Sequence, residues 1–538
     1  MTLQELSIIF FFGFLVFVGI VAYFSSKQKA SGVSADVEYY LGGHSTPTVV
    51  LAFSYVTSSI SAACFMGDPG IMSTVGWPYY WVVIAIVPGL IIPAVLLMPK
   101  MRQQAEKLGS LTIPEYLGQR YNSTALRLII AGVISVFYIF PLVAQFKGAA
   151  VLLESFTGIS FNMGLAIITV VIIFYVIVGG LRSVAWTDFV QGLPMLVISI
   201  VLLVVSLNAV GGFSGLEEKL SQIDPNMLKV VQDEAPDAQM SLSGVLGNFV
   251  FWCVIFISQP YLCSRFLAIP NVKRKTIGTF LITALILSVV YNSFYIAGLT
   301  GRVLFPDVKA DYLTVTMAIN LLPTAVAAFM MIGIFAAMMS TATSVLLVIG
   351  QAVGRDFYSK TINKNASPEK EVLVTRIAIV VVAFICFAFN YVDPPEFLSV
   401  VLYLGLSGIG SCIGIPLFAA IVSFVLLSFC SVSGMSLWTT FIISILATIL
   451  SVVAAMIILA YAGNKVEGMA LAKVSALVMV GLIIPFVITD STQYVFSFLP
   501  SFWIAKFLIS NNYWFILPAI FLSGGLICIL YNRYSTKI

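Results

Sequence analysis

The chain has 538 residues, of which 60% are hydrophobic and only 9% are charged, and its mean hydropathy is +1.06. A soluble domain carries about 25% charged residues, so this composition excludes a water-soluble protein. The net charge of +4 gives no sign of a nucleic-acid partner, and one histidine, His44, cannot form a histidine cluster for a metal. The seven cysteines lie in apolar stretches and are expected to be buried thiols, not a disulfide framework.

Long apolar stretches recur along the whole chain. A helix needs roughly 20 apolar residues to cross a bilayer, and about fourteen such stretches can be marked. They lie near residues 6–24, 48–75, 78–99, 126–155, 160–179, 186–209, 245–263, 278–304, 314–350, 373–391, 396–425, 436–461, 468–489 and 513–531. The first has no basic leader or cleavage site and is expected to be retained. The chain is therefore predicted to be an all-α polytopic protein of the cell membrane, with about 13–15 transmembrane helices.

Basic residues fall in alternate loops, as the positive-inside rule requires of cytoplasmic loops. They follow the first, third, fifth, seventh and ninth stretches, which places the N-terminus outside: Lys27, Lys29, Lys100, Arg102, Lys107, Arg182, Arg265, Lys273, Arg274, Lys275, Arg355, Lys360, Lys364 and Lys370. Charges are nearly absent between residues 396 and 465, so the topology of the last quarter stays open. Residues 491–510 are predicted to form either an interfacial helix or a further span.

Stretches two to six and seven to eleven make two groups of five. An odd number of spans reverses the orientation of the second group, which is the arithmetic of an inverted-repeat transporter. The predicted organisation is an N-terminal extra helix and loop (1–45), a first five-helix repeat (46–210), an extracellular loop (211–243), a second five-helix repeat (244–430) and C-terminal extra helices (431–538).

The second stretch, VVLAFSYVTSSISAACFMGDPGIMSTVGW, is predicted to be a broken helix. Pro69 removes a backbone donor, and Gly67 and Gly70 weaken the helix. Interrupted helices are tolerated at membrane depth where the freed backbone groups line a cavity. Freed carbonyls suit Na⁺, and freed N–H groups suit a substrate carboxylate. The alternative is that the small residues only allow close helix packing.

The ninth stretch contains MMSTATSVLL, which gathers four hydroxyls. At 100° per residue, Ser340, Thr341 and Ser344 share one helix face with Ala337. Together with freed carbonyls they could form a cage of neutral oxygens for Na⁺ that releases its ion easily. The alternative is that the hydroxyls bond back to the carbonyl four residues earlier.

Four motifs resemble signatures of the sodium/solute symporter family: FYVIVGGLRSVAWTDFVQG, LTIPEYLGQRY, YYLGGHS, and AAMMSTATSVLL followed by GRDFY. The resemblance covers residues 36–430, and the sequence departs from the family pattern after residue 421. It implies a LeuT-type fold of inverted five-helix repeats with an extra N-terminal helix. The family includes transporters of proline, pantothenate, sialic acid, sugars and monocarboxylates.

The resemblance also implies roles for individual residues. The main sodium site is similar to one made by the carbonyls of Thr57, Ile60 and Ala337 and the hydroxyls of Ser340 and Thr341. A second sodium site is implied at Asp188, Ser340, Thr343 and Ser344. For Asp188 the alternative is an N-cap at the start of the sixth span.

Substrate contacts are expected between the second and seventh stretches, at Ser58, Ser59, Ser61, Gln145, Gln259 and Tyr261. Tyr261 matches an aromatic inner gate of the family. For Gln145 the alternative is a helix–helix hydrogen bond. No Lys or Arg can be placed at mid-membrane in the core, so a substrate carboxylate would be held by N–H groups and hydroxyls.

The expected function is sodium-coupled import of a small carboxylate, pantothenate-like or another monocarboxylate, by alternating access. DPPEFLSVVLYLGLSGIG, residues 393–410, is similar to pantothenate symporters, whereas proline-type members usually carry an aspartate where this chain has Ser59. A proline, amino-acid, sialic acid or sugar symporter stays open. A proton-coupled transporter, with Asp188 as its titratable group, and a channel are alternatives of another class.

No nucleophile–base pair or phosphate loop is present in the sequence, so no enzymatic activity is expected. The expected partners are sodium, a small organic solute and the lipid bilayer, and the protein is expected to act as a monomer without nucleic acid.

Overall fold

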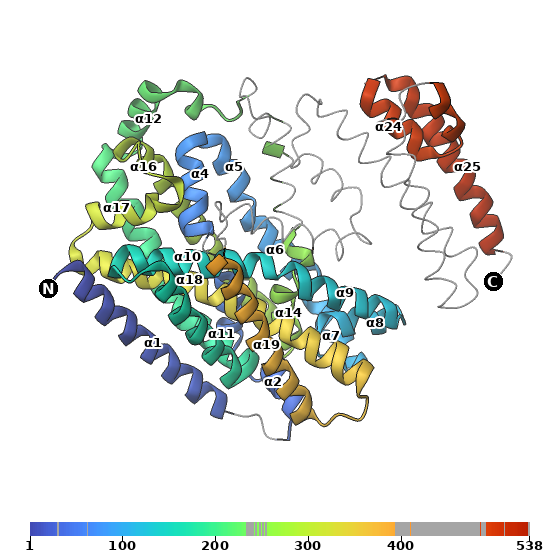
Figure 1. The fold of residues 1–538 in the computed structure, drawn as a ribbon, viewed down its shortest axis with the longest axis horizontal. Coiled ribbons are helices and arrows are strands. Elements are labelled where there is room, and N and C mark those ends of the chain that lie inside the picture. Colours follow the sequence, from blue (N-terminus) through green and yellow to red (C-terminus); the bar gives the residue numbers. More distant parts are fainter. Residues whose placement is uncertain are drawn as a thin grey trace. The chain divides into compact units, whose positions relative to one another are not determined.

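The computed structural model describes residues 1–28, 32–61, 63–232, 255–392, 491–510 and 512–535, with single residues between 242 and 252 and at 409 and 485. These residues form helices joined by short connections (Figure 1). The chain divides into two compact units, which are described separately. The first holds residues 1–232 and 249–415, and the second holds residues 233–248 and 416–538.

In the described part of the chain, seven helices are long and apolar enough to cross a membrane, or eight if a bent pair counts as one span. The spans are α1 (Leu3–Lys27), α5 with α6 (Trp77–Ile84, Ile86–Leu96), α9 with α10 (Thr124–Phe137, Ile139–Thr157), the second half of α11 (Phe161–Val210), α15 with α16 (Arg274–Ser293, Ala297–Leu304), α18 with η8 (Thr324–Gln351, Ala352–Ile362) and α19 (Pro368–Val392). The bent pair lies within residues 48–75. Apart from residues 409 and 485, the predicted spans 396–425, 436–461 and 468–489 lie outside the described residues, as do residues 247, 248, 250, 251, 253 and 254 of the span 245–263.

Helix α18 forms the centre of the first unit. It packs against α1, α10, α11, α19 and the helix over residues 48–59 (Figure 1). Every residue from Met330 to Gln351 is buried. The hydroxyls of MMSTATSVLL therefore face protein and not lipid.

A sharp break at Gly180 divides α11 into two spans, as the predicted stretches 160–179 and 186–209 require. Gly180 has φ +59° and ψ −156°. A Cβ atom there would lie 2.3 Å from the carbonyl oxygen of Tyr39. Only glycine combines this backbone conformation with so close an approach.

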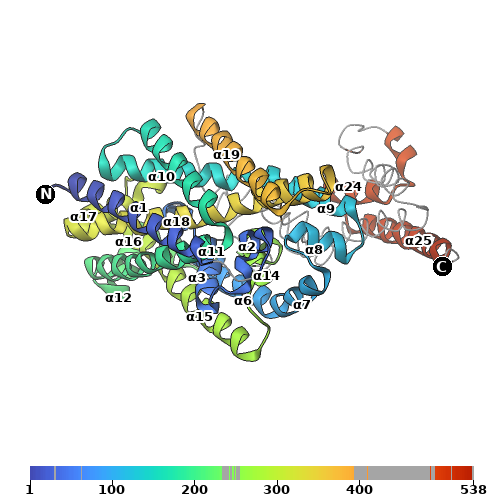
Figure 2. The same ribbon diagram turned by 90° about the horizontal axis from the view of Figure 1, so that it is seen from below.

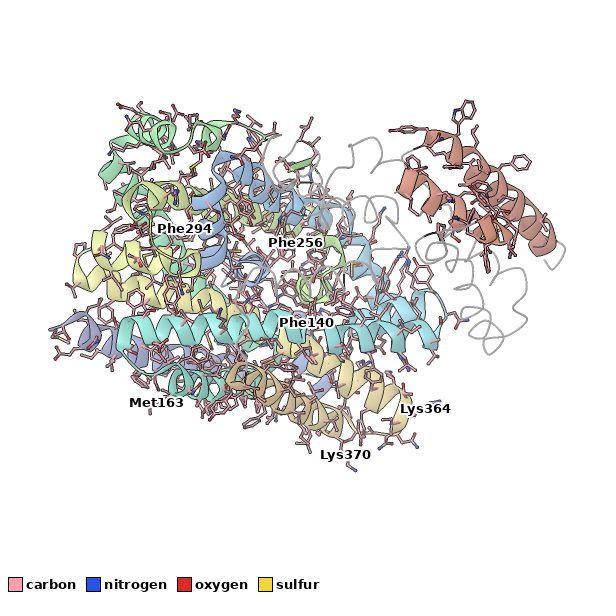
Figure 3. The ribbon with its side chains drawn as sticks, turned by 45° about the horizontal axis from the view of Figure 1, so that its top comes forward. Phe140, Met163, Phe256, Phe294, Lys364 and Lys370 are labelled. Carbon is pink, nitrogen blue, oxygen red and sulfur yellow. The ribbon has the colours of Figure 1, made fainter. Side chains whose placement is uncertain are left out.

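The loops predicted to be cytoplasmic come together in the first unit. Figure 2 shows α2 (Ala35–Leu41) and α7 (Met98–Leu108) beside α14 (Pro260–Ala268), whose C-terminal end leads into the predicted loop at residues 269–273. In Figure 3, Lys364 and Lys370 mark the turn from η8 into α19.

Buried ion pairs connect these loops. Arg355 pairs with Asp36 at 3.1 Å, with Glu115 of α8 (Ile113–Arg120) at 2.7 Å and with Glu371 at 2.9 Å. Burial raises the pKa of Glu115, but the Arg355 guanidinium, the Leu111 N–H and Lys360 together outweigh burial and hold this pKa below its usual value of 4.5. Glu115 is therefore ionised at neutral pH and stabilises the junction.

The described part of the second unit consists of short helices: η10 (Ser491–Phe496), α24 (Pro500–Ser510), η11 (Tyr513–Phe515) and α25 (Ile516–Ser535). α24 has 11 residues, a length of about 16 Å, which is shorter than the bilayer core of about 30 Å. For residues 491–510 this favours the interfacial alternative over a further span. α25 coincides with the predicted last stretch.

Candidate ion and substrate site

The second span is broken, as predicted. α3 (Thr48–Ser59) ends at Ile60, whose φ of −90° and ψ of 113° are not helical. The chain resumes as a π-helical turn, η2 (Ala63–Gly67), and as α4 (Asp68–Val75), with Pro69 in the first turn. The two halves are bent by 59°. The break interrupts the regular helical hydrogen bonding of the last carbonyls of α3, and the N–H of Ile60 instead donates to the oxygen of Thr57 at 3.2 Å.

The hydroxyls of α18 lie against these carbonyls. Ser340 Oγ lies 3.1 Å from the oxygen of Thr57 and 3.0 Å from that of Ala337. Thr341 Oγ1 lies 2.9 Å from the oxygen of Ser58, 3.1 Å from that of Ile60 and 3.2 Å from that of Ala337. The two hydroxyls supply only two protons for these five oxygen–oxygen contacts. The cluster therefore keeps oxygen lone pairs that no proton occupies.

Such a cluster fits a small hard cation. Its donors are all neutral oxygens, which hard cations prefer. The carbonyls also lie at the C-terminal end of α3, where the helix dipole is negative. The structure brings together all five residues named for the main site: Thr57, Ile60, Ala337, Ser340 and Thr341.

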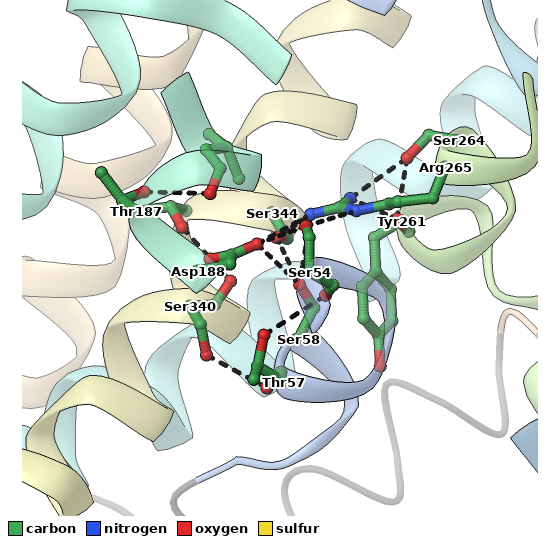
Figure 4. A network of polar contacts seen from close by, with 12 residues as sticks. Ser54, Thr57, Ser58, Thr187, Asp188, Tyr261, Ser264, Arg265, Ser340 and Ser344 are labelled. Atoms are coloured by element: carbon green, nitrogen blue, oxygen red, sulfur yellow. Dashed lines mark hydrogen bonds and ion pairs between the residues drawn. The ribbon is translucent and has the colours of Figure 1, made fainter. Parts of the chain in front are cut away.

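A buried ion pair lies beside this cluster (Figure 4). The guanidinium of Arg265 in α14 lies 3.3 Å from the carboxylate of Asp188 in α11, and both side chains are completely buried. Arg265 also donates to Ser54, Ser58 and Ser344 at 3.1, 3.1 and 2.5 Å. The expectation that the core holds no arginine, with Arg265 in a cytoplasmic loop, is therefore wrong.

Asp188 is the central residue of the second predicted cation site. Its Oδ2 accepts from Ser54 at 2.6 Å and from Ser58 at 3.2 Å, while its Oδ1 has no hydrogen-bond partner among the described residues. The N-cap alternative for Asp188 is wrong, because its helix begins well before it, at Gly179.

The other residues named for that second site lie on the same part of α18. Ser344 Oγ lies 2.9 Å from Ser58 Oγ. Thr343 Oγ1 donates to the carbonyl of Met339, four residues earlier, at 2.9 Å. For Thr343 the structure thus shows the alternative in which the hydroxyl bonds back within its own helix. The oxygen of this hydroxyl still has lone pairs that can accept a hydrogen bond or a cation.

The seventh span is also interrupted, at Gln259, between η5 (Phe256–Ser258) and α14. Gln259 is not helical, with φ −85° and ψ 106°. Its Oε1 accepts from the hydroxyl of Tyr138 at 3.1 Å, and Tyr138 stacks edge-on against Tyr261 with ring centroids 5.7 Å apart. The first span of each group of five is thus broken, which supports the inverted-repeat organisation.

A small enclosed cavity lies between the two broken spans. Its volume of about 10 Å³ is room for about one water molecule. Ser59, Ser61 and Thr341 form one part of its wall, and Asp68 with the rings of Trp252, Phe256 and Tyr261 forms another. In this conformation the cavity is too small for an organic solute.

The substrate contacts named from the sequence separate into two groups. Ser59, Ser61 and Tyr261 line this cavity. Ser58 lies in the network of Asp188, and Gln145 and Gln259 are buried without forming part of the cavity wall. The acidic side chain in the wall, Asp68, was not anticipated, because GDPG signalled only a helix break.

Comparison with known proteins decides the family. The model of the sodium:solute symporter family matches residues 39–426. The chain belongs to the sodium:solute symporter family. The match ends near the point where the sequence departs from the family pattern. A second model, described as fluoroquinolones export permease protein Rv2686c-like, matches residues 409–532.

Curated symporters are similar over most of the chain. The high-affinity proline transporter PutP of Bacillus subtilis is 29% identical over 404 residues, which cover 73% of this chain and 82% of that protein. The sodium/pantothenate symporter of Haemophilus influenzae is 27% identical over 400 residues, covering 74% and 81%.

The fold is that of a solved family transporter. A Na⁺-coupled sialic acid symporter in a substrate-bound, outward-open state matches with a TM-score of 0.64 at 18% identity, covering 88% of this chain and 96% of that chain. The predicted all-α, LeuT-type architecture is thereby confirmed.

Proposed function

We propose that this symporter couples sodium entry to the import of a small organic carboxylate by alternating access. The observation that carries the proposal is the cluster in which the hydroxyls of Ser340 and Thr341 meet the carbonyls of the broken second span. Sodium binds there between α3 and α18. Each positive charge that enters gains about 2.3 kcal/mol per 100 mV of membrane potential.

Thr57, Ile60, Ala337, Ser340 and Thr341 make up the main site. The second site, at Asp188 with Ser340, Thr343 and Ser344, is conditional. Its carboxylate is neutralised by Arg265 at 3.3 Å, and an added cation would lie beside the guanidinium. We therefore expect a second sodium ion only in a conformation in which Arg265 withdraws from Asp188.

A carboxylate substrate is supported in two ways. Proline, pantothenate and sialic acid, the solutes named for the relatives, all carry a carboxylate. The side of the cavity formed by Ser59, Ser61 and Thr341 offers neutral hydroxyls next to the proposed ion. Arg265 has its donors occupied by Asp188 and nearby oxygens, so the substrate anion would be held by hydroxyls, N–H groups and sodium. Pantothenate-like acids and amino acids are both candidates.

The enclosed cavity favours a transporter over a channel, because a channel requires a continuous polar path. A proton-coupled mechanism has a titratable candidate in Asp188, but that carboxylate is already paired with Arg265. Sodium coupling needs no titratable group.

Uptake into proteoliposomes tests the proposal. Radiolabelled L-proline, pantothenate and N-acetylneuraminate are offered with an inward sodium gradient, and with choline in place of sodium at the same pH. We expect at least one solute to accumulate with saturation and only in sodium. Accumulation in choline driven by a proton gradient, or uptake that does not saturate, would contradict sodium symport.

A further inference from the structure

The cavity between the broken spans carries an acidic side chain that the sodium site does not use. Asp68 is the first residue of α4, and its side chain is buried at 1% exposure. The hydroxyl of Tyr79 in α5 donates to Asp68 Oδ1 at 2.9 Å. Tyr79 thus fixes the orientation of the carboxylate in the wall of the cavity.

An acidic group at this depth is costly. Ionisable residues inside membrane helices are rare and face the interior of the bundle or a solute pathway. The closed state leaves Asp68 against the cavity. When the cavity opens to admit a solute, the carboxylate is among the groups that the solute meets.

Aromatic rings line the cavity together with Asp68. Trp252 and Phe256 lie with ring centroids 5.6 Å apart, and both contribute to the wall, as does Tyr261. The faces of aromatic rings attract cations, Trp most strongly. A carboxylate combined with aromatic rings suits a positively charged nitrogen and disfavours an anionic group.

The remaining wall has the opposite preference. Thr341 lines the cavity and also contacts the carbonyl of Ile60 in the proposed sodium site. Ser59 and Ser61 lie at the same break. Sodium held there would attract a substrate carboxylate. The wall of the cavity therefore combines groups suited to an anion with groups suited to a cation.

We infer that Asp68 is a specificity-determining residue that binds a positively charged nitrogen of the substrate. This inference rests on the proposed function and narrows it: the transported carboxylate is a zwitterion, such as an amino acid or a betaine. A carboxylate of the same shape without the charged nitrogen would face Asp68 with an apolar or polar group and bind weakly. Pantothenate, an anion without a positive charge, belongs to this disfavoured class.

Matched pairs of ligands test the assignment. Thermal shifts of the purified full-length protein are measured in sodium and in choline. One matched pair is L-proline and cyclopentanecarboxylate, and the other is glycine betaine and 3,3-dimethylbutanoate. The other proteinogenic amino acids and pantothenate are tested in the same way. We expect at least one zwitterion to stabilise the protein in sodium, and its partner without the nitrogen charge to bind at least about tenfold more weakly.

The variant Asp68→Asn keeps the size of the side chain and removes its charge. We expect this variant to lower the affinity for the zwitterion at least about tenfold and to reduce the difference in affinity between the two members of a ligand pair. Binding should still depend on sodium. Tyr79→Phe leaves the carboxylate but removes its orienting hydroxyl, so a smaller loss in the same direction is expected. Asp224→Asn, at a half-buried loop position that does not line the cavity, serves as the matched control.

Several results would overturn the assignment. One is an Asp68→Asn variant that discriminates between the two members of a pair as well as the wild type does. A second is stabilisation by pantothenate or by the acids without the nitrogen charge, but not by a zwitterion. A third is that no zwitterion stabilises the protein. A further one is a variant that alters only the pH dependence of uptake, because Asp68 would then bind a proton. Sodium-dependent stabilisation by any carboxylate would still leave the proposed function standing, so the two failures are distinguishable.

Discussion

Removing the two hydroxyls of the proposed ion site, by Ser340→Ala and Thr341→Ala, is the most direct test of the ion-binding argument. Ser340 Oγ contacts two carbonyl oxygens and Thr341 Oγ1 contacts three, all within 2.9–3.2 Å. A polar contact to a charged partner contributes about 1.5–3 kcal/mol, and 1.4 kcal/mol corresponds to about tenfold in affinity. Each single variant should therefore raise the half-saturating sodium concentration about tenfold or more.

The double variant should raise it at least about tenfold as well, although the two losses need not add because both ligands hold one ion. The assay is a sodium titration with two readouts: the thermal shift of the protein without substrate, and uptake into proteoliposomes. A matched control removes two buried hydroxyls that only bond back within their own helix. Ser199 donates to Met195 at 2.8 Å and Thr169 donates to Leu165 at 2.8 Å. A double variant with the sodium dependence of the control would refute the site.

Two further predictions concern the buried charges. Removing one partner of a buried ion pair costs about 3–5 kcal/mol. The single variant Arg265→Gln should therefore lower the melting temperature more than the double variant Arg265→Gln with Asp188→Asn. Equal melting temperatures of Arg265→Gln and the wild type would show that the pair is not stabilising. The lowered pKa of Glu115 means that its stabilisation is complete above its usual value of 4.5 and is lost as the pH falls through the folded-state value. The melting temperature should thus fall more steeply below about pH 4.5 in wild type than in Glu115→Gln, and parallel curves would contradict the role of the Arg355–Glu115 pair.

The spans, the break in the second span and the shared face of Ser340 and Thr341 could be predicted from the sequence because their signals are local, whereas the full residue set of the proposed ion site was implied by the family resemblance. Long apolar stretches give membrane helices wherever the bilayer excludes water from the backbone. Pro69 and its flanking glycines mark the break in the second span. The spacing of Ser340 and Thr341 on one helix places their hydroxyls at a common depth. Each of these signals can be found within one helix, but the contact between the α18 hydroxyls and the α3 carbonyls depends on the packing of the two helices.

The charges of the core could not be predicted in this way. Arg265 lies at the end of an apolar stretch and near a basic loop, where the positive-inside rule assigns it to the cytoplasm. Its burial is possible only because Asp188 lies beside it, and the two residues are far apart in the sequence. The position of Asp68 could not be predicted for a related reason. GDPG indicates a turn, and only the folded chain shows the hydrogen bond from Tyr79 to Asp68 and the place of Asp68 with Trp252 in the cavity wall.

Thr341 gives a physical basis for coupling between the two ligands. Its hydroxyl contacts the carbonyls of Ser58 and Ile60 and also lines the cavity. In the proposed mechanism, an ion bound to this hydroxyl would fix the break in the second span, and the same break would supply Ser59 and Ser61 to the substrate. Each ligand therefore orders residues that the other needs, and part of the ordering cost is met by whichever binds first. Because binding linkage is reciprocal, the factor by which sodium increases substrate affinity must equal the factor by which substrate increases sodium affinity.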